Sequence, residues 1–378
     1  MKIKNFLLLI FVVLIGLLFF GCPEPGSSGG SSSGGGGSNN ILNTSYKWKI
    51  YNTNGTSGID KPLARINLRM AYAGNNNLIL FGGGTSTLIT YGDTWEYNAV
   101  THTWTQFNTG GTTGVNKPEG KSNHAMAYAG DSNIILFGGQ FGFIVDETWE
   151  YNALSHTWTQ YNTGGTAGVD KPLGRVNHAM AYAGGSKLIL FGGYRPSTTI
   201  STLCDTWEYD VSTHTWTQYN TGGTPGVDKP INRQYHSMAY VCDSKIILFG
   251  GSDNNGDDLG DTWEYDLSTH TWMQYNTGGI PGTDKPIARN NHAMAYVGST
   301  KLILFGGNNL EVSDQLQDTW EYDISNHIWT QKNTGGITGV DKPSKRYKHA
   351  MTYIGSSKLI LFGGADGVEL DETWEYQR

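Results

Sequence analysis

Positive charge is scarce in this chain of 378 residues. Lysine and arginine together number 26 against 33 aspartate and glutamate residues, which gives a formal net charge of −7. Proteins that bind nucleic acid neutralise phosphates with clustered lysine and arginine, and no basic stripe is available here for that purpose. The composition therefore argues against nucleic acid as a partner.

Long apolar runs are also rare, and the one that stands out covers residues 6–20 behind two lysines. It is short for a bilayer span, which takes about 20 residues. Gly21 and Cys22 follow directly, and the whole segment resembles a bacterial lipoprotein signal, in which a small residue precedes the cysteine that is lipidated. We therefore expect residues 1–21 to be a signal peptide and Cys22 to carry the lipid. An uncleaved signal anchor is the alternative.

The next segment has no means of forming a core. Residues 26–40 contain only glycine, serine and asparagine, so residues 22–43 are expected to be a lipidated, flexible tether. Such a tether would hold a folded domain, residues 44–378, just off a membrane, with the lipid as the only anchor. The expected location is the bacterial cell envelope, at the outer membrane, the cell surface or the periplasmic side.

What the sequence has in abundance is repetition. A Leu-Phe-Gly-Gly motif occurs six times, at residues 80–83, 136–139, 190–193, 248–251, 304–307 and 361–364. A Thr-Trp-Glu-Tyr motif follows each copy, with its tryptophan at 95, 149, 207, 263, 320 and 374. A fixed period of this length indicates a repeat array or a propeller.

The third unit shows how one repeat would fold. Residues 177–182 alternate small with large side chains, as expected of a strand. Residues 187–191 form a continuous apolar run, as expected of a strand buried on both faces. Residues 206–209 and 214–219 are predicted to add a third and a fourth strand. Four antiparallel strands per repeat make one blade of a β-propeller.

These residues resemble the kelch family. Its mark is a run of aliphatic residues, a Gly-Gly pair, and then a tyrosine and a tryptophan separated by six residues. Five pairs have this spacing: Tyr97 and Trp104, Tyr151 and Trp158, Tyr209 and Trp216, Tyr265 and Trp272, and Tyr322 and Trp329. The resemblance covers residues 46–378 and implies an all-β, six-bladed propeller. It says little about function, because one fold hosts many functions.

The two ends of the repeat region complement each other. The last repeat stops at residues 373–378 and lacks a fourth strand, whereas residues 46–52 match the fourth-strand residues 102–108. We therefore predict that the first folded strand completes the last blade, which would remove an open seam and favour a monomer.

Repetition also bears on residues that could suggest catalysis. Five histidines recur at the start of the first strand, and five recur before the fourth-strand tryptophan. A residue present once per blade is expected to serve the blade, whereas catalysis needs unlike groups in one place. Some kelch-like propellers are copper oxidases with a Tyr–Cys cofactor and others act on sialic acid, but neither motif is evident. We predict no catalytic residue, no metal and no cofactor.

The two cysteines other than Cys22 are expected to be unpaired. Cys204 ends a loop between second and third strands, and Cys242 ends a first strand. A strand of about 20–25 Å, at roughly 3.3 Å per residue, would separate them. A disulfide requires Cα atoms within about 7 Å, so the sequence predicts two free thiols.

Variation is concentrated in the loops between second and third strands, while the other turns within each blade are short and similar. Antiparallel order places these loops on the same face as the blade-to-blade connections, and we call it the loop-rich face. Loops on a rigid scaffold usually carry binding residues. The candidate ligand-binding residues are Tyr91, Phe141, Phe143, Tyr194 and Arg195 from blades one to three, and Asp253, Asp257, Asp258, Glu311 and Asp314 from blades four to six.

Apolar residues beside charged ones are typical of a recognition surface. We therefore expect a membrane-tethered interaction module that presents this face to a protein or glycan. One alternative is an enzyme that acts on a small sugar at the central channel, where Leu68, Lys121, Tyr235 and Lys348 break the repeat pattern. Another alternative is an envelope scaffold without a ligand, in which the variable loops only fold over their own blades. Residues 253–258 could form either a calcium loop or an acidic solvated turn.

Overall fold

Every element in the part of the chain that the computed structural model describes is a β-strand. None of the described residues forms a helix able to span a bilayer. The expected signal peptide, tether and Cys22 lie outside the described residues. The described ranges are 47–51, 54–107, 110–161, 164–196, 201–219, 222–242, 244–275, 278–312, 314–332, 335–356 and 358–377.

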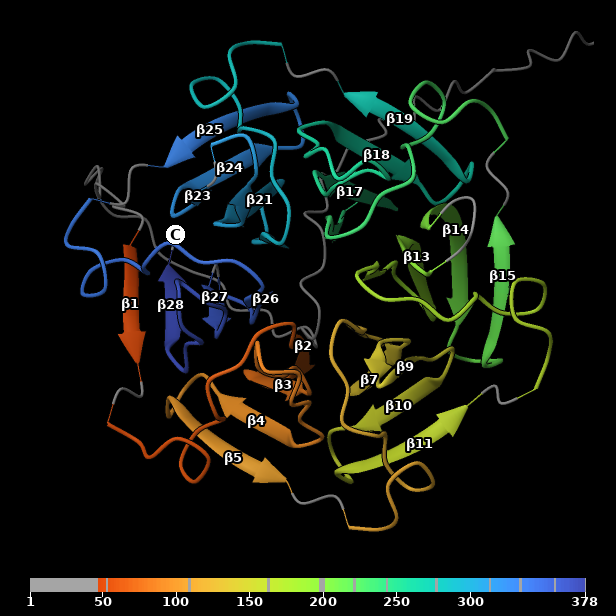
Figure 1. Ribbon diagram of the computed structural model, residues 1–378, viewed down its shortest axis with the longest axis vertical. Coiled ribbons are helices and arrows are strands. Elements are labelled where there is room, and N and C mark those ends of the chain that lie inside the picture. The colour runs from red at the N-terminus through yellow and green to blue at the C-terminus, as the bar shows by residue number, and fades with distance from the viewer. Residues whose placement is uncertain are drawn as a thin grey trace, which may run out of the picture.

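Six four-stranded antiparallel sheets stand in a ring (Figure 1), which confirms the predicted all-β, six-bladed propeller. From the innermost strand outward, blades 1 to 3 are β2 (Arg69–Gly74), β3 (Asn77–Phe81), β4 (Thr94–Asn98) and β5 (Thr103–Phe107); β6 (Ala125–Tyr128), β7 (Asn133–Phe137), β10 (Thr148–Asn152) and β11 (Thr157–Tyr161); and β12 (Ala179–Tyr182), β13 (Lys187–Tyr194), β14 (Thr202–Asp210) and β15 (Thr215–Tyr219).

Blades 4 to 6 follow the same order and end with the strand from the other end of the chain. They are β16 (Ser237–Val241), β17 (Lys245–Phe249), β18 (Thr262–Asp266) and β19 (Thr271–Tyr275); β20 (Ala293–Tyr296), β21 (Lys301–Phe305), β24 (Thr319–Asp323) and β25 (Ile328–Lys332); and β26 (Ala350–Tyr353), β27 (Lys358–Phe362), β28 (Thr373–Gln377) and β1 (Lys47–Tyr51). Two small loop hairpins are β8 (Gln140–Phe141) with β9 (Phe143–Ile144), and β22 (Asn308–Asn309) with β23 (Asp314–Gln315).

The predicted closure of the ring is confirmed. Strand β1 pairs antiparallel with β28, with Trp48 opposite Tyr376 and Ile50 opposite Trp374. In Figure 1 the two strands lie side by side although they come from opposite ends of the colour bar. The last blade therefore has the same four strands as the others.

The hydrophobic cores lie between blades rather than within them. One core joins Ile79 and Phe81 of blade 1 to Met126 and Trp149 of blade 2, and the other cores likewise combine neighbouring blades. A strand is buried on both faces only when a second blade covers it, which explains the continuous apolar runs of the second strands.

The fourth-strand tryptophan carries much of each interface. Trp272 of blade 4 lies with its ring centroid 5.0 Å from that of Phe191 in blade 3, and its indole N–H donates to Thr206 Oγ1 at 3.1 Å. Trp48, on the N-terminal strand, makes the equivalent contacts with Phe305 and Thr319, at 5.0 Å and 3.3 Å. Trp48 of the N-terminal strand thus makes the contacts that the fourth-strand tryptophan makes in the other blades.

A closed ring of six main-chain hydrogen bonds surrounds the central channel. It is formed by the residue two positions before each first strand, and each N–H donates to the carbonyl oxygen of its counterpart in the preceding blade at 2.9–3.1 Å. All six have a left-handed backbone, with φ between 53° and 60°. We call them the annulus residues: Asn67, Asn123, Asn177, Tyr235, Asn291 and Lys348.

Replacing Trp48 should destabilise the propeller as much as replacing a tryptophan within the repeats. Trp48→Ala removes a buried indole and is expected to cost about 3–5 kcal/mol of unfolding free energy. Trp272→Ala is the matched control, because it loses the same contacts two blades away. Denaturant unfolding of both variants makes the comparison, and a loss at Trp272 without one at Trp48 would show that β1 is not part of the folded ring.

Deleting residues 47–51 should expose the edge of β28 and cause unfolding or self-association. Light scattering and thermal unfolding report the two effects. A monomeric deletion variant with an unchanged melting temperature would contradict the closure.

Candidate functional site: the loop-rich face and the channel mouth

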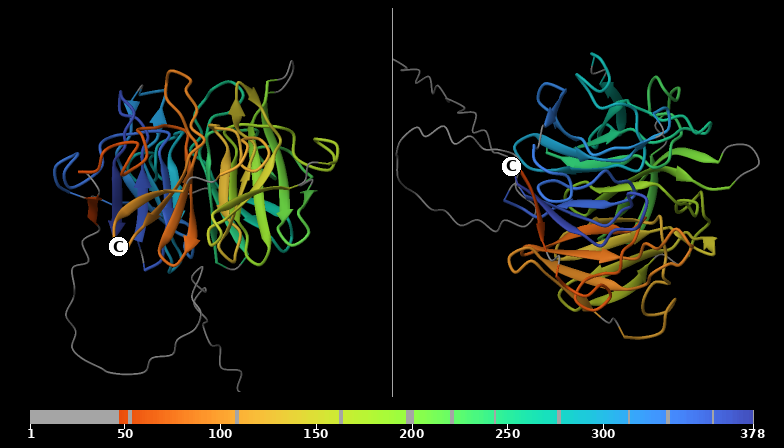
Figure 2. Two further views of the ribbon diagram at one scale, coloured as in Figure 1. Left: turned by 90° about the horizontal axis from the view of Figure 1, so that it is seen from below. Right: turned by 60° about the vertical axis from the view of Figure 1, so that its left-hand side comes forward.

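The variable loops and the blade-to-blade connections lie on one face of the ring, as the strand order predicts. Bridges join the two kinds of segment directly, as between Ile66 and Gly84, between Ser122 and Gln140, and between Val176 and Tyr194. Figure 2 shows these loops gathered at one end of the blades. The loop-rich face is therefore built from paired backbone and not from isolated loops.

A buried ion pair holds each loop to its connection. The Arg65 guanidinium is fully buried and binds both carboxylate oxygens of Asp93, at 2.6 and 2.7 Å. It also donates to the carbonyl oxygen of Gly82, while Trp95 donates its indole N–H to the same aspartate at 2.7 Å. Equivalent pairs join Arg175 to Asp205, Arg233 to Asp261, Arg289 to Asp318, and Arg346 to Glu372.

Blade 2 builds the same pair from different residues. Lys121 replaces the arginine and lies 2.6 Å from Glu147, which replaces the aspartate and accepts the indole N–H of Trp149. The sequence singled out Lys121 as a possible channel residue, but the structure places it in this network. The carboxylate two residues before each third-strand tryptophan was missed, although its presence in all six repeats was a usable signal.

Two aromatic residues that the sequence predicted to bind a ligand, Tyr91 and Phe141, pack over cations of this network. The Tyr91 ring centroid lies 4.4 Å from the Arg65 guanidinium carbon, and the Phe141 centroid lies 5.6 Å from Lys121 Nζ. Phe143 packs on Phe141 with ring centroids 4.5 Å apart and is 63% exposed. Tyr91 and Phe141 therefore have a structural role, and Phe143 projects from them.

The remaining predicted residues of blades 1 to 3 are less engaged. Tyr194 is half-buried at the end of β13, where its backbone pairs with Val176, and Arg195 is exposed. Leu88 and Ile89, in the loop of blade 1, are 87% and 56% exposed. Leu88, Ile89 and Phe143 are thus exposed apolar side chains on the loops of neighbouring blades 1 and 2, and we refer to the three together as the apolar ridge.

The predicted acidic residues mostly hold loops together. Asp253 accepts the backbone N–H groups of Asn255 and Asp257, at 2.8 and 2.9 Å, and so closes its own turn. Asp258 accepts the Leu310 backbone N–H at 2.7 Å and thereby joins the loop of blade 4 to that of blade 5. These contacts favour the acidic turn over the calcium loop for residues 253–258. No cluster of three or more metal-ligating side chains occurs within the described ranges.

Asp314 forms an exposed ion pair with Lys345 at 2.7 Å, and Glu311 is exposed. The expected division into apolar and acidic halves is less sharp than the sequence indicated. Leu310, Val312 and Val368 of blades 5 and 6 are 54%, 59% and 65% exposed. Apolar side chains therefore project from both halves of the loop-rich face.

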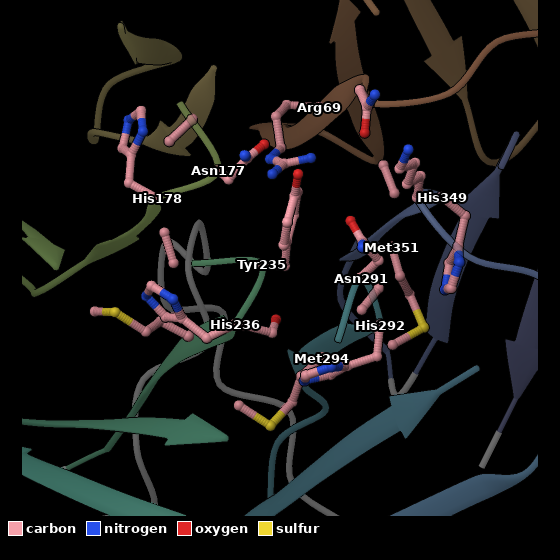
Figure 3. Close-up of a pocket in the computed structure, with 18 of the residues that line it drawn as sticks. Arg69, Asn177, His178, Tyr235, His236, Asn291, His292, Met294, His349 and Met351 are labelled. Carbon is pink, nitrogen blue, oxygen red and sulfur yellow. The ribbon is translucent and has the colours of Figure 1, made fainter. Parts of the chain in front are cut away.

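The channel contains a cavity of about 130 Å³, lined by the annulus residues and the starts of the first strands (Figure 3). His178, His236, His292 and His349 border it, and each packs edge-on against a phenylalanine of the preceding blade. Burial, with Arg233 nearby, lowers the pKa of His236 to about 3. These histidines are neutral packing groups, in keeping with their repetition.

Of the residues that break the repeat pattern, Tyr235 and Lys348 do lie at the channel, whereas Leu68 takes the place of a packing histidine and is fully buried. The sequence analysis missed Arg69, which also lines the cavity. Its signal was visible in the repeats, because every equivalent position holds a small residue: Ala125, Ala179, Ser237, Ala293 and Ala350.

The prediction of two free thiols is correct for Cys204 and wrong for Cys242. Cys204 is free and half-buried, whereas Cys242 is disulfide-bonded. The predicted separation concerns only the distance between Cys204 and Cys242.

The buried ion pairs should make the fold sensitive to acid. Burial opposes ionisation of Asp93, Asp205, Asp261 and Asp318, but the paired arginines and the indole N–H groups outweigh it and hold the pKa of each below its usual value. A depressed folded-state pKa gives stability that is complete above the unfolded value, about 3.9, and is lost as the pH falls through the folded value. The melting temperature should therefore drop steeply below about pH 4.

Asp205→Asn should leave Arg175 buried without a carboxylate and cost about 3–5 kcal/mol of unfolding free energy. Asp131→Asn, at an exposed turn position, serves as the control and should cost little. Denaturant unfolding at pH 7 measures both. Equal stability of the two variants would show that the network is dispensable.

Comparisons with known proteins agree with this architecture. The family model described as the KLHDC2/KLHL20/DRC7 Kelch-repeats domain matches residues 29–227 and 224–377. Adagio protein 3 of Arabidopsis thaliana is 27% identical over 272 residues, covering 69% of this chain and 40% of its own length. An F-box/kelch-repeat protein of the same plant is 27% identical over 277 residues, covering 68% of this chain and 54% of its own.

Multiple epidermal growth factor-like domains protein 8 of Mus musculus is 27% identical over 318 residues, which cover 82% of this chain and 11% of its own length. The chain thus matches about half or less of each of these relatives. The repeats, the six closed blades and the family match together lead to one assignment: the chain belongs to the kelch-repeat family of β-propellers.

Proposed function

We propose that this propeller is an interaction module that binds a protein or glycan through its loop-rich face and is held at a bacterial cell envelope by a lipid. The observation that carries the binding role is the apolar ridge of Leu88, Ile89 and Phe143, which is exposed on the loops of two neighbouring blades. Exposed apolar patches rimmed by polar residues are typical of recognition sites, and we infer that these three side chains form such a patch.

The base of the ridge supports this role. Phe143 packs on Phe141, which lies over the buried Lys121–Glu147 pair, so the exposed ring stands on a fixed support. An aromatic side chain that is already ordered loses little entropy when a partner covers it. Binding energy at interfaces is concentrated in such aromatic anchors.

Binding is favoured over glycoside hydrolysis by the chemistry of the channel. Hydrolysis of a glycosidic bond ordinarily uses two carboxyl groups flanking that bond. The described lining of the cavity includes Arg69, Lys348, Tyr235 and neutral histidines, without an aspartate or glutamate. The features that carry the lipid tether are in the sequence: the apolar run at residues 6–20, Cys22, and the glycine- and serine-rich residues that follow.

Photo-crosslinking should locate the partner on the loop-rich face. A photoreactive amino acid at position 143 is expected to give adducts in intact cells, because this side chain is exposed on the proposed surface. Position 154 is the control, since Leu154 is 72% exposed in a turn at the opposite end of the same blade. Adducts of equal yield from both positions, or from position 154 alone, would contradict the proposal.

Removing the apolar side chains of the ridge should weaken binding of the partner so identified. The variant Leu88→Ser, Ile89→Ser, Phe143→Ser is expected to weaken binding at least about tenfold, in line with the loss of an aromatic anchor. The matched variant Val100→Ser, Leu154→Ser removes comparably exposed apolar groups from the opposite face and should bind normally. Calorimetric titration with the purified partner compares them.

The tether makes a separate prediction. Mass spectrometry of the mature chain should find Cys22 at the N-terminus with a thioether-linked lipid, and Cys22→Ser should move the protein from the membrane fraction to the soluble fraction. Membrane association that survives Cys22→Ser would contradict lipid anchoring.

A further inference from the structure

The central channel holds two cations that the other blades do not have. Arg69 stands where the equivalent residue elsewhere is alanine or serine, and Lys348 stands where four other annulus residues are asparagine. They belong to neighbouring blades, 1 and 6, and the backbone of Lys348 accepts a hydrogen bond from Asn67, two residues before Arg69. Both residues line the same cavity.

Neither cation has an acidic partner among the described residues. The Arg69 guanidinium donates to the carbonyl oxygen of Leu68 at 2.8 Å, and Lys348 Nζ lies 5.2 Å from the ring centroid of Tyr347. Ion pairs elsewhere in the described chain satisfy the buried arginines 65, 175, 233, 289 and 346, whereas none reaches Arg69 or Lys348. The described lining of the cavity includes no carboxylate.

The lack of a nearby carboxylate affects the stability of the two cations in the cavity. Burial lowers the pKa of Arg69 to about 10, so the guanidinium remains charged at neutral pH. Burial also lowers the pKa of Lys348. Arg69 and Lys348 are half-buried. A partly desolvated charge without a counter-charge is destabilising, and an anion that enters the cavity reduces this penalty.

A neutral donor faces the cations from the far side of the ring. Tyr235 belongs to blade 4, opposite blade 1, and in Figure 3 its hydroxyl points toward the Arg69 guanidinium. Burial raises the pKa of Tyr235, so its hydroxyl remains protonated and able to donate. A planar guanidinium and a hydroxyl together match the oxygens of a carboxylate, sulfate or phosphate group.

The size and walls of the cavity suit a small anionic group. Its volume of about 130 Å³ is well above the roughly 10–15 Å³ that a cavity needs to hold one water molecule. Buried methionines, among them Met294 and Met351, form part of the wall, and an apolar wall strengthens charge pairing in the cavity.

We propose that the channel mouth binds a small oxyanion through Arg69, Lys348 and Tyr235. The anion is either a free ion or the acidic end group of a larger molecule that enters from the loop-rich face. This site does not depend on partner binding at the apolar ridge, and its variants should leave crosslinking from position 143 unchanged.

The test is titration calorimetry on the full chain in detergent, at constant ionic strength set with chloride. The probes are sulfate, inorganic phosphate and D-glucuronate, with D-glucose as the uncharged control. The oxyanions should bind and raise the melting temperature, and glucose should do neither. Tighter binding of glucuronate than of the inorganic ions would identify an acidic sugar end group, and the reverse order would identify a free ion.

The variants restore what the other repeats contain. Arg69→Ala and Lys348→Asn should each weaken oxyanion binding about tenfold or more, the usual effect of losing a hydrogen bond to a charged group. Arg69→Lys should keep part of the affinity, because it retains the charge and loses the planar fork. Lys47→Ala, which removes an exposed charge on the outermost strand of blade 6, should bind like the unmodified chain.

A second readout separates this site from a merely structural role. Without oxyanions, the double variant Arg69→Ala, Lys348→Asn should melt above the unmodified chain, since it lacks the unpaired charges. With saturating oxyanion the order should reverse or the gap should close. The proposal is overturned if no oxyanion shifts the melting temperature beyond chloride, or if the double variant responds as the unmodified chain does.

Discussion

The structure depends on one constraint: a single blade cannot bury its own apolar surface. Each hydrophobic core is assembled from two neighbouring sheets, and each fourth-strand tryptophan packs on a phenylalanine of the preceding blade. A linear array would leave an apolar face at each end, so stability requires a closed ring. The pairing of β1 with β28 meets that requirement, and Trp48 supplies the contact that the last repeat lacks.

Many side chains of the loop-rich face are likewise used to hold the structure together. The buried cations under its loops are bound by carboxylates, capped by carbonyl oxygens and, in blades 1 and 2, covered by Tyr91 and Phe141. Side chains that look available for recognition in the sequence are therefore often occupied in holding the loops. What is left exposed, such as Phe143, stands on this support, and a rigid support is what a binding residue needs.

Repetition made the fold predictable and also limited what could be predicted of the site. Six copies of one pattern define the blades, the face on which the loops lie and the strand that closes the ring, because these follow from local periodicity and strand order. The carboxylate before each tryptophan could have been predicted, because it recurs in all six repeats, whereas Arg69 stands out only when the equivalent positions of the repeats are compared. The use of Asp258 to join two loops depends on a contact distant in sequence, which no local pattern encodes.

At each annulus position the backbone closes the ring of hydrogen bonds, while the side chain sets the chemistry of the channel. Its six bonds use only backbone N–H and carbonyl groups, so the side chains at these positions are free to differ without breaking the ring. The left-handed backbone favours asparagine, and tyrosine or lysine there carries a conformational cost, which makes Tyr235 and Lys348 informative departures. The six annulus positions surround one channel, and the side chain at each can be substituted independently. Substituting them one at a time would change which ligand the channel binds, because the pairing of β1 with β28 closes the ring without these side chains.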